Sequence, residues 1–179
     1  DHFYHLVLVV MRRKHVLASL PALARSRRVE TFLFLGNNAA GPDLLIDALG
    51  ADRVLIGFPN AAGYFEGPVV HCIAGQESDP SSIPFGEVDG TIKPRTRRVA
   101  QILDSMPGYS ADIQTHMDDW LKTHVALLFP TLAPALRACG MDRLRMVNTR
   151  DAMLLYIRSL RESFQVVRSQ GIRTLPGRL

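Results

Sequence analysis

The chain has 179 residues, a length that allows one ordinary domain or two small ones. Hydrophobic residues make up 47% of it and charged residues 21%, so it can bury a core, and the class of disordered tails is excluded. The longest apolar run, Leu6–Met11, is far shorter than the roughly 20 residues of a membrane-spanning helix. We therefore expect a globular protein with no membrane partner.

The start of the chain and its cysteines bear on where the protein works. The sequence begins with Asp1 rather than Met, and no basic segment precedes the first apolar run as it would in a signal peptide. Cys72 and Cys139 form neither a CxxC pair nor a disulfide framework, which favours a reducing compartment. We expect a cytoplasmic protein, of which this sequence is one piece.

The net charge is +4, and 18 of the 21 basic residues are arginine. Arginines cluster at Arg12–Lys14, Arg25–Arg28 and Arg95–Arg98, and such clusters can bind the phosphates of nucleic acids. The clusters are scattered among apolar periodic segments, however, and lack interleaved aromatic residues on which bases could stack. We therefore expect a solvated basic surface and no nucleic-acid partner, and keep the nucleic-acid binder as an alternative.

Three apolar runs predict buried strands in the first part of the chain: His5–Met11, Thr31–Leu35 and Arg53–Phe58. Between them, Lys14–Ala24 has apolar residues at helical spacing, with Pro21 expected to interrupt or kink the helix. A second helix is expected to begin at Pro42-Asp43 and to end at Gly50. Strands that alternate with helices over short connections predict a parallel α/β sheet.

After Gly67 the pattern changes. Pro68–Ile73 and Ser82–Phe85 are predicted to form an antiparallel pair of strands at the edge of the sheet, followed by a turn at Gly86–Gly90. Pro94–Met106 is predicted as an amphipathic helix with Val99, Ile102 and Leu103 facing inward. Ala111–Gln114 is a candidate for a last short strand.

Beyond His116 the strand patterns stop. Met117–Leu136 and Met146–Val167 carry long helical patterns joined by Gly140-Met141-Asp142. The fold class is therefore predicted as α/β followed by all-α. We place the division in the segment Gly108–Thr115, with a first domain of residues 1–112 and a second of residues 113–179.

The loop that follows the second predicted strand is the first candidate for a functional site. Ligands of open α/β sheets bind beyond the carboxyl ends of the strands, and Asn37 and Asn38 follow Thr31–Leu35 there. Asparagine offers both a hydrogen-bond donor and an acceptor, and the small residues Ala39–Gly41 permit close approach by a flat ligand. The alternative, a tight turn capped by an asparagine side chain, stays open.

Lys122 is the second candidate, because it lies on a mainly apolar predicted helix at the start of the second domain. A partly desolvated lysine can act as a general acid, whereas a surface lysine whose stem lies over Trp120 is the alternative. The sequence contains no HExxH motif and no GxSxG motif, so we expect neither a metal site nor a serine-hydrolase nucleophile.

A set of short motifs, taken in their order and spacing along nearly the whole chain, resembles the ketopantoate reductase (2-dehydropantoate 2-reductase) family. These motifs are Leu6–Arg12 (LVLVVMR), Leu35–Gly41 (LGNNAAG), Ala51–Gly57 (ADRVLIG), Gly67–His71 (GPVVH), Gly86–Gly90 (GEVDG) and Trp120–Lys122 (WLK). The resemblance implies a Rossmann-type NADP-binding domain followed by an all-helical domain, with the active site between them. It also implies hydride transfer from NADPH to a 2-keto acid, a role in pantothenate biosynthesis, and a homodimer formed through the helical domain.

The resemblance also implies roles for individual residues. Lys122 matches the family's general acid, and Asn37 matches the asparagine near the nicotinamide and the substrate. Arg12 and Asn38 are then expected to bind the cofactor. Arg12 stands where the family often has a lysine, so the charge is kept and the shape of the donor is changed.

The sequence departs from the family pattern in several places. It contains no GxGxxG turn, which in a Rossmann domain holds the pyrophosphate, and it stops before the family's substrate-binding serine and glutamate. Ala126 and, two turns after the lysine, Phe129 or Pro130 replace asparagines, which leaves substrates other than ketopantoate open. We expect a chain truncated at both ends, inactive by itself, with a non-catalytic fragment or assembly module as the alternative.

Overall fold

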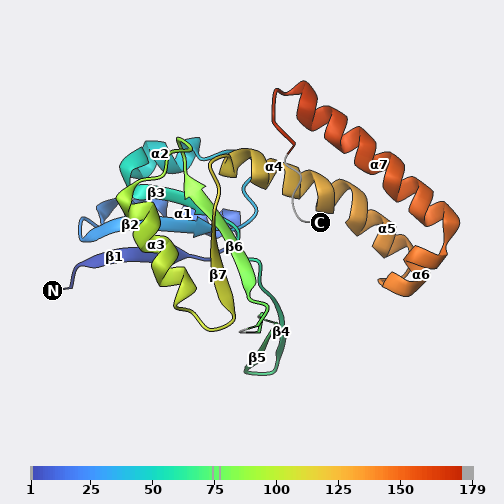
Figure 1. Cartoon of the computed structure of the whole chain (residues 1–179), viewed down its shortest axis with the longest axis horizontal. Helices are drawn as coiled ribbons and strands as arrows, with labels where there is room; N and C mark the ends of the chain where they lie inside the picture. The colour runs from blue at the N-terminus through green and yellow to red at the C-terminus, as the bar shows by residue number, and fades with distance from the viewer. Residues whose placement is uncertain (1, 74, 77, 175–179) are drawn as a thin grey trace. The chain divides into compact units, whose positions relative to one another are not determined.

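The structure, a computed structural model, describes residues 2–73, 75–76 and 78–174 (Figure 1). The chain divides into two compact units, the first ending at Asp118 and the second beginning at Asp119. The boundary expected after residue 112 lies within the first unit.

The first unit is built on a five-stranded sheet with the strand order β1-β2-β3-β6-β7. Its first three strands are parallel, as the apolar runs predicted, and they are β1 (Tyr4–Val9), β2 (Val29–Leu35) and β3 (Val54–Gly57). Two helices and a short 3₁₀ turn connect them: α1 (Arg13–Arg25), α2 (Asp43–Leu49) and η1 (Ala51–Arg53). Pro21 lies inside α1 and does not end that helix.

Burial explains why the runs of β2 and β3 form strands. The burial predicted for His5–Met11 is wrong, because β1 lies at the edge of the sheet and only its Val9 is buried. In β2, Thr31 and Phe32–Leu35 are buried on both faces of the sheet, which suits a continuous apolar sequence and not an alternating one. The carboxyl ends of β2 and β3 lie side by side, because Leu35 is paired with Gly57. The Gly36 N–H donates to the Gly57 carbonyl at 3.0 Å and so extends this alignment into the loop that contains the two asparagines.

The predicted pairing of the next two strands is wrong. β5 (Val69–Ile73) pairs with β4 (Ala62–Glu66), a strand that we did not predict, and the two form a separate exposed sheet. β6 (Ser81–Glu87) instead lies inside the main sheet, antiparallel to β3 and parallel to β7 (Tyr109–Ile113). The reason is burial, since the residues from Ile83 to Glu87 are buried and need covering on both sides. β6 therefore runs into the segment that was predicted as a turn.

α3 (Pro94–Asp104) packs against β6 and β7 and closes the core of the first unit. Val99 and Leu103 are buried in this core, as predicted, together with Leu33, Leu55 and Phe85. Ile102, which was also predicted to face inward, is 38% exposed. Residues 99 and 103 are four apart and share one face of a helix, whereas residue 102 lies at the border of that face.

The second unit is helical, as predicted, but its helices are shorter than the sequence pattern suggested. The long helix predicted from Met117 is divided into α4 (Met117–Leu127), a π-helical turn η2 (Leu128–Leu132) and α5 (Ala133–Ala138). Two prolines fall in this stretch, and proline has no N–H to donate to the preceding turn. The second long helix is divided at Thr149 into α6 (Arg143–Asn148) and α7 (Arg150–Ser169), and α7 packs against η2 and α5. Within the described residues, no helix is long and apolar enough to cross a membrane.

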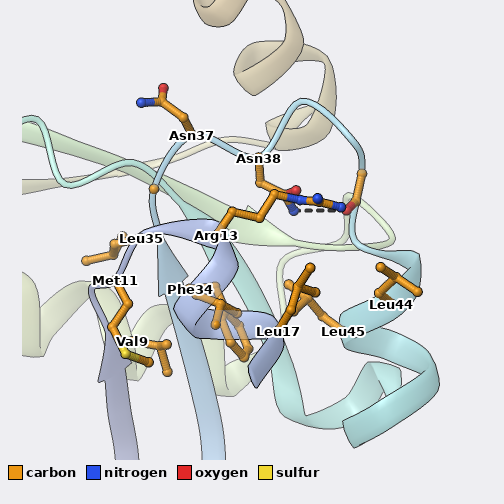
Figure 2. Close-up of a pocket in the computed structure, with 13 residues that line it drawn as sticks. Val9, Met11, Arg13, Leu17, Phe34, Leu35, Asn37, Asn38, Leu44 and Leu45 are labelled. Carbon is orange, nitrogen blue, oxygen red and sulfur yellow. Dashed lines mark hydrogen bonds between the residues drawn. The ribbon is translucent and has the colours of Figure 1, made fainter. Parts of the chain in front are cut away.

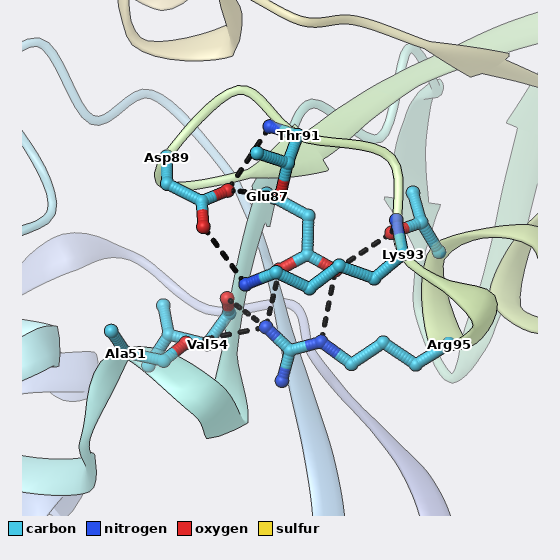
Figure 3. Close-up of polar contacts among 8 residues, drawn as sticks. Ala51, Val54, Glu87, Asp89, Thr91, Lys93 and Arg95 are labelled. Carbon is cyan, nitrogen blue, oxygen red and sulfur yellow. Dashed lines mark hydrogen bonds and ion pairs between the residues drawn. The ribbon is translucent and has the colours of Figure 1, made fainter.

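The Gly86–Gly90 motif contributes a buried acid to the first unit (Figure 3). The side chain of Glu87 is fully buried, and Arg95 and Thr96 at the start of α3 both donate hydrogen bonds to it. Lys93 lies 3.5 Å from Glu87 Oε2 and 2.9 Å from Asp89 Oδ2. Burial raises the pKa of Glu87, but the hydrogen bonds from Arg95 and Thr96 outweigh it, so the pKa lies below its ordinary value.

Candidate functional site

A pocket opens at the carboxyl ends of β1 and β2, between the starts of α1 and α2 (Figure 2). It contains about 470 Å³ of empty space, part of which is open to solvent. Its walls are mainly apolar and include Val9, Met11, Leu17, Phe34, Leu44 and Leu45. The polar residues that line it are Arg13, Asn37 and Asn38. An apolar hollow with few polar groups at this edge of an α/β sheet is typical of a small-molecule site.

Asn37 lies at the rim of this pocket, one residue beyond Gly36 at the end of β2. Its side chain is exposed and points away from the apolar wall residues (Figure 2). The backbone of β2 positions Asn37, because Gly36 is hydrogen-bonded to β3 immediately before it. An exposed amide in this position can donate to, or accept from, a ligand that lies above the ends of the strands.

Asn38 serves the loop itself. Its Nδ2 donates to the carbonyl of Gly41 at 2.9 Å, and the side chain is half-buried. Gly41 has a φ of +84°, a left-handed conformation that glycine adopts without strain. The capped turn that the sequence left as an alternative is therefore present at Asn38.

The basic residues that follow β1 differ in where they lie. Arg12 occupies the position before the first turn of α1, is exposed and is not among the residues that line the pocket. Arg13, the first residue of the helix, does line it. The sequence prediction named Arg12, whose role in cofactor binding stays a prediction, and it did not name Arg13. The basic run Arg12–Lys14 was visible, but the side of the helix on which each residue lies depends on where α1 begins.

Lys122 belongs to the second unit, where it lies in α4 and is half-buried. Its neighbours on the helix include Trp120, whose ring stacks on that of His124 at 4.9 Å between ring centroids and an interplanar angle of 11°. Burial lowers the pKa of His124, so this ring is neutral at pH 7 and adds no second positive charge to the helix. The structure therefore places Lys122 half-buried on a helix that also holds the stacked Trp120 and His124 rings, and its role as a general acid stays a prediction.

Across residues 2–73, 75–76 and 78–174, no three His, Cys, Asp or Glu side chains lie together in a group that could hold a metal ion. The two cysteines are both free thiols, Cys72 exposed and Cys139 buried.

No protein-family model matches the sequence, and no curated protein matches it. Solved structures do match. A D-mandelate dehydrogenase in complex with NADH aligns with 94% of this chain, with a TM-score of 0.74 and 13% identity. The 2-dehydropantoate 2-reductase from Geobacter metallireducens aligns with 98% of it, with a TM-score of 0.71 and 17% identity. The enzyme from Porphyromonas gingivalis also aligns with 98%, with a TM-score of 0.69 and 15% identity.

The chain has the fold of these enzymes. It spans between 55% and 59% of the length of the three structures. The predicted architecture, a partial Rossmann-type sheet followed by a helical segment, is thereby confirmed, and so is the resemblance to the ketopantoate reductases at the level of fold.

Proposed function

We propose that this chain is part of an oxidoreductase that reduces a 2-keto acid to a 2-hydroxy acid with a nicotinamide cofactor, NADPH. The observation that carries the proposal is the pocket at the ends of β1 and β2, with Asn37 at its rim, in a fold shared with 2-dehydropantoate 2-reductases and a D-mandelate dehydrogenase. Asn37 and Lys122 are the residues proposed to act on the substrate.

We propose that the nicotinamide end of such a cofactor enters this pocket. A flat ring can pack on its apolar walls, and the amide of Asn37 can pair with the carboxamide of the ring. When bound, the reduced nicotinamide supplies a hydride to the carbonyl carbon of the acid. The glycine-rich turn that would hold the pyrophosphate is not in this sequence, so the pocket accounts for one end of the cofactor only.

In this mechanism Lys122 stabilises and protonates the substrate oxygen. As the carbonyl carbon gains a hydride, its oxygen becomes negatively charged, and a lysine ammonium is a suitable partner for that charge. Lys122 Nζ gives one proton to the oxygen and is protonated again from solvent. The sum is 2-keto acid, NADPH and a proton converted to 2-hydroxy acid and NADP⁺. Asn37 orients the reactants without adding a charge.

The residues that follow Lys122 on its helix also limit which substrates can be bound. Ala126 follows one turn after Lys122, and Phe129 and Pro130 follow two turns after it, so none of these positions offers a hydrogen bond to a hydroxyl group. We propose a ketopantoate-like acid and include acids with apolar side chains. If ketopantoate is the substrate, the step belongs to pantothenate biosynthesis, and we place the enzyme in the cytoplasm.

The test uses the complete protein, meaning this chain with any residues that precede or follow it in its gene. Oxidation of NADPH and of NADH is followed with a panel of 2-keto acids. Lys122→Ala should lower kcat about 100-fold or more and leave cofactor affinity nearly unchanged. Lys122→Arg should also lose turnover, because a guanidinium keeps the charge but is too weak an acid. Near-normal turnover in Lys122→Ala would remove the lysine from the mechanism.

A second candidate function is an assembly module of the same fold. The second unit exposes large apolar side chains, among them Leu144 at 73%, Leu155 at 64% and Val166 at 57%, and such side chains favour a partner surface. We propose that two copies of the chain form a homodimer through α6 and α7. Sedimentation of wild type and Leu155→Arg tests the dimer, and a pure assembly module should give no saturable change in NADPH fluorescence.

A further inference from the structure

Arg13 is the cation of the pocket described above. It is the first residue of α1, and its side chain extends from that helix in the direction of Asn38 (Figure 2). Arg12, its neighbour in the chain, does not line the pocket. Of these two adjacent arginines, therefore, only Arg13 can contact a ligand inside the pocket.

The guanidinium of Arg13 is available to a ligand. Among the residues that the structure describes, no carboxylate forms an ion pair with Arg13, whereas Arg95 and Arg98 each bind a glutamate. The first turn of α1 contains no acidic residue that could compete. The positive end of the helix dipole lies at the same place and adds to the attraction of an anion.

We infer that Arg13, and not Arg12, binds an oxyanion group of the ligand that enters this pocket. Guanidinium groups bind phosphate and carboxylate through paired charge-assisted hydrogen bonds. The inference rests on the proposed function for the identity of the oxyanion, which is either a phosphate of the cofactor or the carboxylate of the 2-keto acid. In both cases an apolar body lies against the walls and the oxyanion lies at the rim.

The experiment uses two small probes on the chain of residues 1–179. Reduced nicotinamide mononucleotide carries the ring and a single phosphate and needs no glycine-rich turn, and phenylglyoxylate carries a carboxylate on an apolar body. Affinities are measured by calorimetry for wild type, Arg13→Ala, Arg13→Lys, Arg12→Ala and Arg27→Ala. Arg27 is an exposed arginine outside the pocket and is the charge-matched control. Thermal unfolding of each variant checks the fold.

Arg13→Ala should weaken at least one probe about tenfold or more, with Arg13→Lys intermediate and the other two variants within about twofold of wild type. Loss confined to the mononucleotide identifies phosphate as the oxyanion, and loss confined to phenylglyoxylate identifies carboxylate. The inference is overturned if neither probe binds to wild type, if Arg13→Ala binds both normally, or if Arg12→Ala loses as much. Turnover with Lys122 variants is a separate measurement, so failure of the proposed reaction and failure at Arg13 are distinguishable.

Discussion

Arg95, in the first turn of α3, holds both carboxylate oxygens of Glu87 at the end of β6. Its Nε donates to Oε1 at 2.9 Å, its Nη2 contacts Oε2, and Nη2 also donates to the carbonyl of Ala51 at 3.2 Å. One guanidinium thus connects a helix, the end of a strand and the turn before β3. Glu87 is fully buried. Removing the charge of one partner of this ion pair should therefore destabilise the folded protein, because the other charge stays buried without a counter-charge.

Glu87→Gln keeps the shape of the side chain and removes its charge. We expect it to lower the free energy of unfolding by about 3 kcal/mol, because the guanidinium of Arg95 then stays buried without a counter-charge. Asp89→Asn is the matched control, since the side chain of Asp89 is 46% exposed, and it should cost less than about 1 kcal/mol. Urea unfolding of both variants measures the difference. Equal decreases in the free energy of unfolding for the two variants would contradict the explanation that the burial of Glu87 causes the effect.

The same carboxyl group makes stability depend on pH. The folded pKa of Glu87 lies below its ordinary value of 4.5, so the unfolded chain binds more protons near that pH and stability rises with pH there. The stabilisation from Glu87 is complete above the ordinary pKa and is lost as pH falls through the folded pKa. The difference in unfolding free energy between wild type and Glu87→Gln should therefore shrink as pH falls from 7 to 3. A constant difference across this range would contradict the assignment.

The end of β3 requires a glycine for space. A Cβ at Gly57 would lie 2.8 Å from Phe85 Cβ and 2.8 Å from the Pro84 carbonyl oxygen, closer than side-chain carbons normally approach. Gly57→Ala should therefore destabilise the protein by about 1–3 kcal/mol. Gly36, whose N–H donates to the Gly57 carbonyl, is the control, because a Cβ there would meet only the Met11 carbonyl oxygen at 3.6 Å. Similar melting temperatures for the two alanine variants would refute the steric explanation.

Asn37 is proposed to orient the reactants through its exposed amide. In the complete protein, Asn37→Ala should lower kcat/KM about tenfold or more, because a hydrogen bond to the reactants is lost. Asn37→Asp should be worse, since a carboxylate at this position repels a 2-keto acid. Both variants should unfold at the wild-type temperature, because the side chain is exposed. Unchanged steady-state kinetics in both variants would exclude Asn37 from the site.

Cofactor affinity is expected to differ between residues 1–179 and a longer gene product that contains a GxGxxG turn. The sequence contains no GxGxxG turn, so residues 1–179 lack the phosphate cradle of a Rossmann domain. We expect NADPH to bind residues 1–179 at least about a hundredfold more weakly than it binds a protein that contains this turn. The reason is that two or more charge-assisted hydrogen bonds to the phosphates, of about 1.5 kcal/mol each, are lost. Titration of NADPH fluorescence measures both affinities. Equal affinities would show that the cofactor is held without that cradle.

Local sequence patterns predicted the five strands of the main sheet, the parallel order of the first three and the position of Asn37, but not β4. These properties depend on neighbours along the chain, since an apolar run such as Thr31–Leu35 can be covered only inside a sheet, and the residue after it must emerge at the sheet edge. The helical character of the second unit follows in the same way from its periodicity. The roles assigned to Asn37 and Lys122 remain predictions.

Tertiary structure decided which strands pair and which arginine reaches the pocket. The sequence of Ser82–Phe85 predicts a strand but does not specify its partner strands. The tertiary structure places it between β3 and β7 and not beside Pro68–Ile73. Arg12 and Arg13 are the same residue type at adjacent positions, and they differ only through the point at which α1 begins. Pairing and helix phase arise from contacts between distant segments, which no local pattern records.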